Sequence, residues 1–136
     1  MAGFINPSLP QMAEDTSKIT LPTTTMELSF RCSNLRDKDI LSKSDPVAII
    51  FGKTKGSQNW LELWRSEMIL NNLSPSWKKT FFYDYRFEEN QPLRIDIYDW
   101  DTSDHGTSKD IKDQDLIGRL ETNMGSIVSS KQFSAV

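Results

Sequence analysis

Apolar and polar residues alternate along several short stretches of the chain, and this pattern predicts β-strands. Between Met26 and Cys32 every second residue is apolar, which is the period of a half-buried strand. The run from Pro46 to Phe51 is apolar throughout, which favours a strand buried on both faces. The same reasoning predicts four further strands, at residues 60–65, 80–87, 93–98 and 116–124.

Six strand candidates separated by turn residues predict an all-β fold, an antiparallel β-sandwich. The segment 71–75, Asn-Asn-Leu-Ser-Pro, is the strongest turn signal between them. No stretch predicts a long helix, because Pro75 soon follows the short apolar group at 68–70. Most of the aromatic residues, including Trp64 and Trp100, are assigned to the core.

The two ends of the chain are weakly patterned. Residues 1–24 show little periodicity and contain three prolines, so we expect a flexible leader followed by one domain over residues 25–136. Six strands make a thin sandwich with an unpaired edge near the end of the chain. We therefore expect this domain to be truncated at its C-terminus and to lack its last strands.

The overall charge and the cysteine content narrow the functional class. The net charge is -3, which gives no sign of nucleic-acid binding. A single cysteine excludes an intrachain disulfide and fits a reducing compartment, so we expect a cytoplasmic location. Because no run of about 18 apolar residues occurs, any membrane contact is expected to be peripheral.

Aspartates are concentrated in two loops that are far apart in the sequence, each joining the end of one strand to the start of another. Asp99 and Asp101 are separated by one residue, so in an extended chain their carboxylates point the same way. Such close like charges repel each other unless a cation lies between them. Five of the aspartates lie at or just outside a strand end and form a predicted cage: Asp39, Asp45, Asp99, Asp101 and Asp115.

Calcium is the cation that this donor set favours, since it takes about 6–8 oxygen ligands. No histidine or cysteine pattern indicates zinc. An EF-hand starting at Asp101 is excluded because Lys112 stands where a bidentate glutamate is needed. The alternative is that loop aspartates are merely solvated turn formers, and the remaining ones are assigned to that class: Asp37, Asp104, Asp110 and Asp113.

Four motifs resemble those of the C2 domain family. Asp39–Pro46 resembles the first calcium loop, which ends in Ser-Asp-Pro, and Tyr98–Asp101 resembles the third loop with its Asp-x-Asp pair. Asp115–Gly118 is similar to the Asp-x-x-Gly that opens the next strand, and Ser74–Trp77 to the turn before an aromatic strand. The resemblance covers residues 25–133. Within the family the chain is most similar to the first C2 domain of copines, on three runs: Arg36–Asp39, Phe87–Arg94 and Ile127–Ser130.

The resemblance implies a Greek-key sandwich that binds calcium and anionic phospholipid and is not an enzyme. Such a module would target its parent protein from the cytoplasm to membranes when calcium rises. By position, the five aspartates would be the side-chain ligands, with the backbone carbonyls of Lys38 and Trp100 in addition. The stretch before Asp115 is longer than in common members, which leaves Asp113 open as the last ligand.

Membrane contact by this resemblance would involve Ile40 and Leu41, with Lys43 facing the anionic surface. The alternative for the two apolar residues is that they pack loop on loop. A second possible lipid contact is a basic sheet face, with a solvated face as the alternative; its residues are Lys53, Lys55, Lys78, Lys79, Arg86 and Arg94. The rival function is a C2-like protein-interaction domain, contacting other proteins with weak or no calcium dependence.

Overall fold

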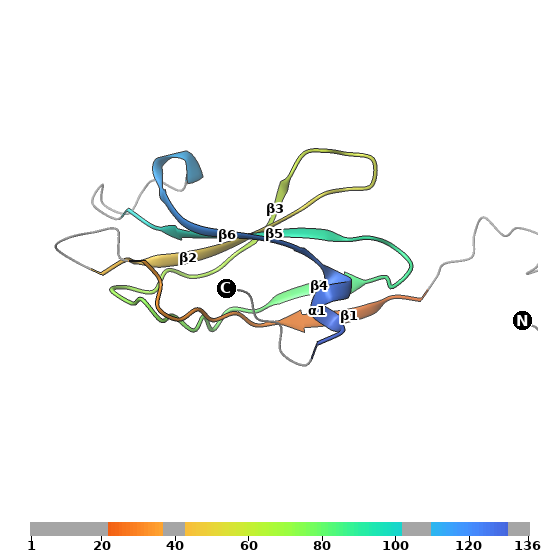
Figure 1. Ribbon diagram of the computed structural model, residues 1–136, viewed down its shortest axis with the longest axis horizontal. Coiled ribbons are helices and arrows are strands. Elements are labelled where there is room, and N and C mark those ends of the chain that lie inside the picture. The colour runs from red at the N-terminus through yellow and green to blue at the C-terminus, as the bar shows by residue number, and fades with distance from the viewer. Residues whose placement is uncertain (1–21, 37–42, 102–109, 131–136) are drawn as a thin grey trace, which may run out of the picture.

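The computed structural model describes residues 22–36, 43–101 and 110–130, and they form an antiparallel β-sandwich (Figure 1). This confirms the predicted fold class. Six strands and two short helices follow one another along the chain: β1 (Thr24–Leu28), β2 (Pro46–Gly52), β3 (Leu61–Arg65), β4 (Phe81–Tyr85), β5 (Pro92–Asp99), the 3₁₀ helix η3 (Ile111–Asp113), β6 (Asp115–Asn123) and α1 (Met124–Val128).

The strands form two layers. One sheet has four strands in the order β3-β2-β5-β6, and the other pairs β1 with β4. Every pairing is antiparallel. The chain crosses between the layers after β1, β3 and β4, so the loops gather at the two ends of the sandwich (Figure 1).

Strand β2 explains why its sequence is apolar without alternation, since all seven of its residues are buried. Ala48 and Ile50 face the core between the two sheets. Val47, Ile49 and Phe51 face the other side of the four-stranded sheet, where they form a second apolar cluster with Tyr98. A strand that contributes to two clusters needs apolar residues at every position.

The core between the sheets is largely aromatic. Trp64 and Phe81 contact each other with ring centroids 6.1 Å apart, and Phe30 lies 5.4 Å from Trp64. Leu93 and Met124 complete the core as fully buried side chains. The core assignment of Trp64 is therefore confirmed.

Two strands end two or more residues before their predicted ends. β1 ends at Leu28 rather than at Cys32, although the chain beyond it stays beside residues 75–77 through backbone hydrogen bonds such as Cys32 N–H to the Pro75 carbonyl, 2.9 Å. β4 ends at Tyr85, and Phe87 beyond it is 75% exposed. The strand predicted over residues 80–87 thus extends only as far as Tyr85.

The helix α1 was not predicted, because five residues are too few to show helical periodicity. Asn123 caps it, accepting a hydrogen bond at its side chain from the Ser126 N–H. Met124, its first residue, is fully buried and anchors the helix to the core. Within the described residues, no helix has the length and apolar character needed to cross a membrane.

Candidate functional site

Three of the predicted cage residues lie at one end of the four-stranded sheet. β2 begins at Pro46, directly after Asp45, and Pro46 is paired with Asp99 at the end of β5. Asp99 is in turn paired with Asp115 at the start of β6. Directly paired residues of antiparallel strands have Cα atoms about 4.5–5.5 Å apart. The fold therefore brings Asp45, Asp99 and Asp115 together from three neighbouring strands.

Two hydrogen bonds tie the segments that carry these aspartates. The Asp45 N–H donates to Oδ1 of Asp99 over 3.0 Å, and the Trp100 N–H donates to the Asp45 carbonyl, also over 3.0 Å. Each segment thus supplies a donor to the other. This reciprocal pairing fixes the start of β2 against the end of β5.

A third segment, residues 68–72 between β3 and β4, lies against the same end. The Asn71 N–H donates to Oδ1 of Asp45 over 2.7 Å, and the Asn72 N–H donates to the Ser44 carbonyl over 2.9 Å. Asn71 adopts φ of 48°, a left-handed conformation that asparagine tolerates better than most residues. From the sequence, residues 71–75 were interpreted only as a turn and residues 68–70 as a short apolar group, so this contact was not predicted.

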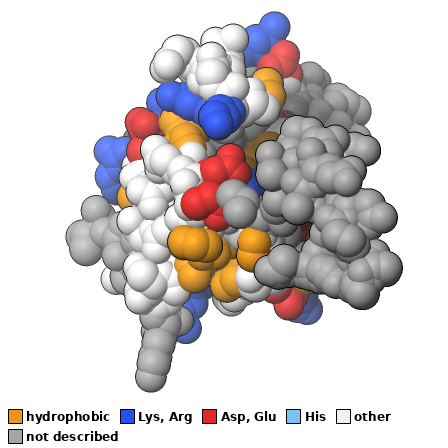
Figure 2. All heavy atoms as spheres, turned by 90° about the vertical axis from the view of Figure 1, so that its right-hand side faces the viewer, with side chains coloured by type: hydrophobic (Ala, Val, Ile, Leu, Met, Phe, Trp, Pro, Cys, Tyr) orange, Lys and Arg blue, Asp and Glu red, His pale blue; other side chains and the backbone are white. Residues whose placement is uncertain are grey.

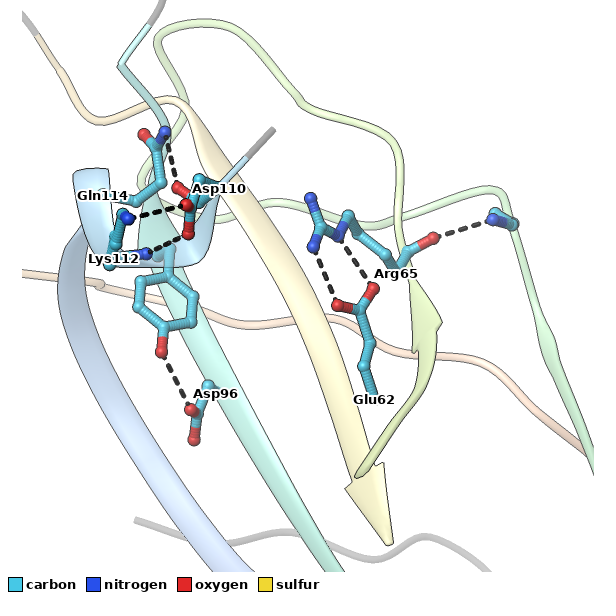
Figure 3. A network of polar contacts seen from close by, with 8 residues as sticks. Glu62, Arg65, Asp96, Asp110, Lys112 and Gln114 are labelled. Atoms are coloured by element: carbon cyan, nitrogen blue, oxygen red, sulfur yellow. Dashed lines mark hydrogen bonds and ion pairs between the residues drawn. The ribbon is translucent and has the colours of Figure 1, made fainter. Parts of the chain in front are cut away.

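Gln114 arranges the chain on the β6 side of the site. Its buried side chain accepts a hydrogen bond from the Asp101 N–H and donates one to the Asp110 carbonyl over 3.4 Å. Figure 3 shows Gln114, Asp110 and Lys112 around η3. The Lys112 N–H donates to the Asp110 carboxylate and lowers the pKa of that group. Gln114 therefore joins the end of η3 to Asp115, the first residue of β6.

The two candidates for the last ligand have different surroundings. Asp113 belongs to η3, whereas Asp115 is the first residue of β6 and lies opposite Asp99. Both are exposed. Asp101 lies two residues after Asp99, beyond the end of β5, so the strand rule that aligns alternate side chains does not extend to it.

Trp100 packs inward, as predicted, against the second apolar cluster. The Arg65 guanidinium lies over its ring, 5.0 Å from the centroid. Glu62 holds Arg65 through two hydrogen bonds of 2.8 and 2.9 Å (Figure 3). The side chain of Trp100, the residue between Asp99 and Asp101, is therefore held against the sheet, while the backbone of Trp100 lies at the acidic end.

A buried ion-pair network lies on the same face of the sheet. Asp96 is fully buried and accepts two hydrogen bonds from Arg119, of 2.8 and 3.0 Å. Arg94 contacts it at 3.2 Å, and the Tyr98 hydroxyl donates to it over 3.1 Å. These contacts raise the pKa of Arg119, and burial followed by the Asp96 charge raises that of Tyr98. Sequence reasoning missed this network.

Several of the predicted basic-face residues have partners within the sandwich. Lys53 lies 4.4 Å from the centroid of the Trp60 ring, and the Lys79 ammonium donates to the Arg65 carbonyl over 2.8 Å. Arg86 pairs with Glu89 at 3.5 Å, and Arg94 stacks 4.3 Å from the Phe51 centroid. Arg94 also lies 5.4 Å from the Trp60 centroid, so Lys53 and Arg94 share one aromatic ring, whereas the partners of Lys79 and Arg86 are different residues.

One aspartate of the predicted cage, Asp39, lies outside the described residues, as do the predicted backbone ligand Lys38 and the predicted membrane-contact residues Ile40 and Leu41. Lys43 is described and exposed. Among the residues that the structure describes, no group of three acidic, histidine or cysteine side chains is arranged to hold a metal ion. What this part of the chain does supply is carboxylate and carbonyl oxygen atoms, the donors that suit a hard cation such as calcium.

The fold and the acidic end define the class of protein. Residues 28–135 match the family model of the C2 domain, and the chain belongs to the C2 domain family. It is 39% identical over 110 residues to Copine-D of Dictyostelium discoideum, covering 81% of this chain and 21% of that protein. It is 36% identical to nicotinic receptor-associated protein 1 of Caenorhabditis briggsae, covering 93% of this chain and 22% of that protein. The chain thus spans about a fifth of the length of these curated relatives.

Solved structures show the same fold. BON1-C2B is 26% identical with a TM-score of 0.58, covering 77% of this chain and 67% of that one. A calcium-bound structure of the C2A and C2B domains of Extended-Synaptotagmin 2 is 23% identical with a TM-score of 0.56, covering 82% of this chain and 38% of that one. The resemblance to C2 domains, and to copines among them, is confirmed.

Proposed function

We propose that this chain is a calcium-dependent module that binds anionic phospholipid and so targets its parent protein to membranes. The observation that carries the proposal is the meeting of Asp45, Asp99 and Asp115 at three neighbouring strand ends. Membership of the C2 family supports a regulatory rather than a catalytic module. The similarity of the fold to a calcium-bound C2 structure is consistent with the proposal.

The residues at the acidic end fit calcium by their chemistry. Asp45, Asp99 and Asp115 offer only oxygen donors, and Asp101 follows directly on the same loop. Asp39 and the carbonyls of Lys38 and Trp100 complete the proposed ligand set. Asp115 is preferred to Asp113 because its pairing with Asp99 brings their backbones together.

The charge of this end accounts for the dependence on calcium. Carboxylates gathered at one end repel an anionic membrane, and the chain carries a net charge of -3 overall. Calcium held by these carboxylates would cancel part of that charge and would supply coordination positions for lipid phosphate. The exposed ammonium of Lys43, two residues from Asp45, then faces the surface with less opposing charge, and Ile40 and Leu41 enter the interface.

Vesicle sedimentation tests the proposal. The chain is mixed with vesicles that contain phosphatidylserine, first with calcium and then with an excess of chelator, and pelleted. Binding with calcium and release by chelator are the expected results, and the Asp99→Asn and Asp101→Asn variants should bind less. Equal binding under both conditions would overturn the proposal and favour a protein-interaction domain without a calcium switch.

A further inference from the structure

We propose that residues 68–72, between β3 and β4, form a further membrane-contacting segment in which Leu70 is the apolar anchor. The inference rests on the proposed function and adds a contact to those expected near Ile40, Leu41 and Lys43. It follows from the exposure of one leucine and from the hydrogen bonds that hold it beside Asp45.

Leu70 points away from the sandwich while its neighbours point into it. Met68 packs against the second apolar cluster, and Ile69 packs against the core between the sheets. Leu70 itself is 62% exposed. Because Met68 and Ile69 are packed against the sandwich, the backbone next to Leu70 is held in place while the Leu70 side chain extends into solvent.

The backbone around Leu70 is held on both sides. The Ile69 N–H donates to the Pro46 carbonyl over 3.3 Å, and the Asn72 N–H donates to the Ser44 carbonyl over 2.9 Å. Between them, the Asn71 N–H donates to Oδ1 of Asp45 over 2.7 Å. Because the segment is already ordered, inserting its side chain into an apolar environment has a small entropic cost.

The surroundings of Leu70 point to a lipid surface as the occupant. Leu70 precedes Asn71, whose N–H donates to the Asp45 carboxylate. A ligand that covers Leu70 therefore also lies beside the acidic end. A membrane interface offers anionic phosphates and, just below them, an apolar layer. The Lys43 ammonium, and the calcium proposed at Asp45, would meet the phosphates, and the exposed Leu70 side chain would reach the apolar layer.

The opposite end of the sandwich supplies a matched control. Phe87 lies in the turn between β4 and β5, and β5 runs from there to Asp99, so Phe87 is at the far end from the aspartates. It is 75% exposed, more than Leu70. Figure 2 looks onto this far end, where apolar, acidic and basic side chains lie next to one another.

Fluorescent labelling tests whether Leu70 meets lipid. Leu70→Cys and Phe87→Cys are each made in a Cys32→Ser background and labelled with a polarity-sensitive dye. With phosphatidylserine vesicles and calcium, the dye at position 70 is expected to shift to the blue and chelator to reverse the shift. The dye at position 87 is expected to stay unchanged.

Truncation gives an independent measurement. Leu70→Ala is expected to weaken calcium-dependent vesicle binding roughly tenfold, because most of the leucine side chain would no longer be buried in the membrane interface. Phe87→Ala is expected to bind vesicles like the unaltered chain. Calcium affinity without vesicles should not change, since the hydrogen bonds around Leu70 use backbone atoms. A thermal melt checks that both variants are folded.

The outcomes separate this inference from the proposed function. If the unaltered chain binds vesicles with calcium but the dye at position 70 does not shift and Leu70→Ala binds equally well, the inference is wrong and the proposed function stands. If the unaltered chain fails to bind vesicles with calcium, both are wrong. A blue shift at position 70 with tenfold weaker binding of Leu70→Ala supports both.

Discussion

The Asp45 N–H donates a 3.0 Å hydrogen bond to Oδ1 of Asp99, so two aspartates from distant parts of the chain are joined through a backbone donor. The carboxylate of Asp45 is in turn held by the Asn71 N–H. Backbone N–H groups carry partial positive charge and offset some of the repulsion between carboxylates. The fold therefore holds this part of the acidic end together with its own backbone.

Replacing Asp99 by asparagine is expected to weaken calcium binding at least about tenfold while the fold is kept. The asparagine Oδ1 still accepts the hydrogen bond from Asp45, but the negative charge is lost. A unit charge within a few Å of a divalent ion is worth more than the roughly 1.4 kcal/mol that corresponds to a factor of ten. Isothermal titration calorimetry with calcium measures the change.

Asp84→Asn is the matched control for this variant. Asp84 lies on β4 and accepts a 2.7 Å hydrogen bond from the Thr25 hydroxyl, so the same charge is removed from the other sheet. Calcium affinity should be nearly unchanged. If Asp99→Asn binds calcium as tightly as Asp84→Asn, then Asp99 is not a ligand.

Asparagine at position 115 is expected to weaken calcium binding more than asparagine at position 113. Asp115 is paired with Asp99 across β5 and β6, whereas Asp113 belongs to η3. Titration of the two variants under the same conditions ranks them. The reverse order would identify Asp113 as the last ligand and would mean that the loop before β6 rearranges when calcium binds.

The sequence predicted the strands well because each strand carries its own pattern. Alternation located β3 and β5, and the unbroken apolar run located β2, which the structure shows to be buried on both faces. The same local signals placed Asp45, Asp99 and Asp115 at strand ends. Antiparallel pairing then brings those ends together, which is why the position of these three residues at one end of the sheet could be predicted, while their role as ligands stays a prediction.

The contacts that shape the site could not be predicted in the same way. The bond from Asn71 to Asp45 joins residues on different loops, and the bond from Asp101 to Gln114 joins the two ends of the long loop between β5 and β6. Neither leaves a local periodicity, because the partner of each group is chosen by tertiary packing. Helix α1 was missed for another reason, since one short turn with a polar cap resembles an ordinary loop.

Asp96→Asn is expected to destabilise the fold by about 2–3 kcal/mol. The asparagine keeps the shape of the side chain but leaves Arg119 and Arg94 beside a neutral group in a buried position. Removing one partner of a buried ion pair typically costs about 3–5 kcal/mol, and the value is reduced here because Arg119 reaches solvent. Urea unfolding at pH 7 measures it.

The Arg86–Glu89 pair is the control for this prediction. Both side chains are exposed, and they lie 3.5 Å apart in the turn after β4. Glu89→Gln should change stability by less than about 1 kcal/mol, as for exposed ion pairs in general. A loss for Asp96→Asn as small as the loss for Glu89→Gln would show that the buried network is not a main source of stability.

Glu67 makes the stability of the fold depend on pH in the acid range. Burial acts to raise the pKa of its carboxylate, but N–H groups of Lys78 and Lys79, at 2.7 and 3.3 Å, outweigh burial and hold the pKa below its ordinary value. A pKa that is lower in the folded than in the unfolded state means that ionised Glu67 stabilises the fold. This contribution is complete when the pH is above the pKa of Glu67 in the unfolded chain. It is lost as the pH falls through the lower pKa of Glu67 in the folded chain.

Glu67→Gln should therefore be less stable than the unaltered chain near neutral pH, and the difference should shrink as the pH falls from about 6 to about 3. Urea unfolding of both proteins across this range gives the difference at each pH. Glu121→Gln, an exposed change on β6, controls for the loss of one negative charge. A Glu67→Gln difference that stays constant from pH 6 to pH 3 would contradict the prediction, because the lost contribution would then come from packing rather than from ionisation.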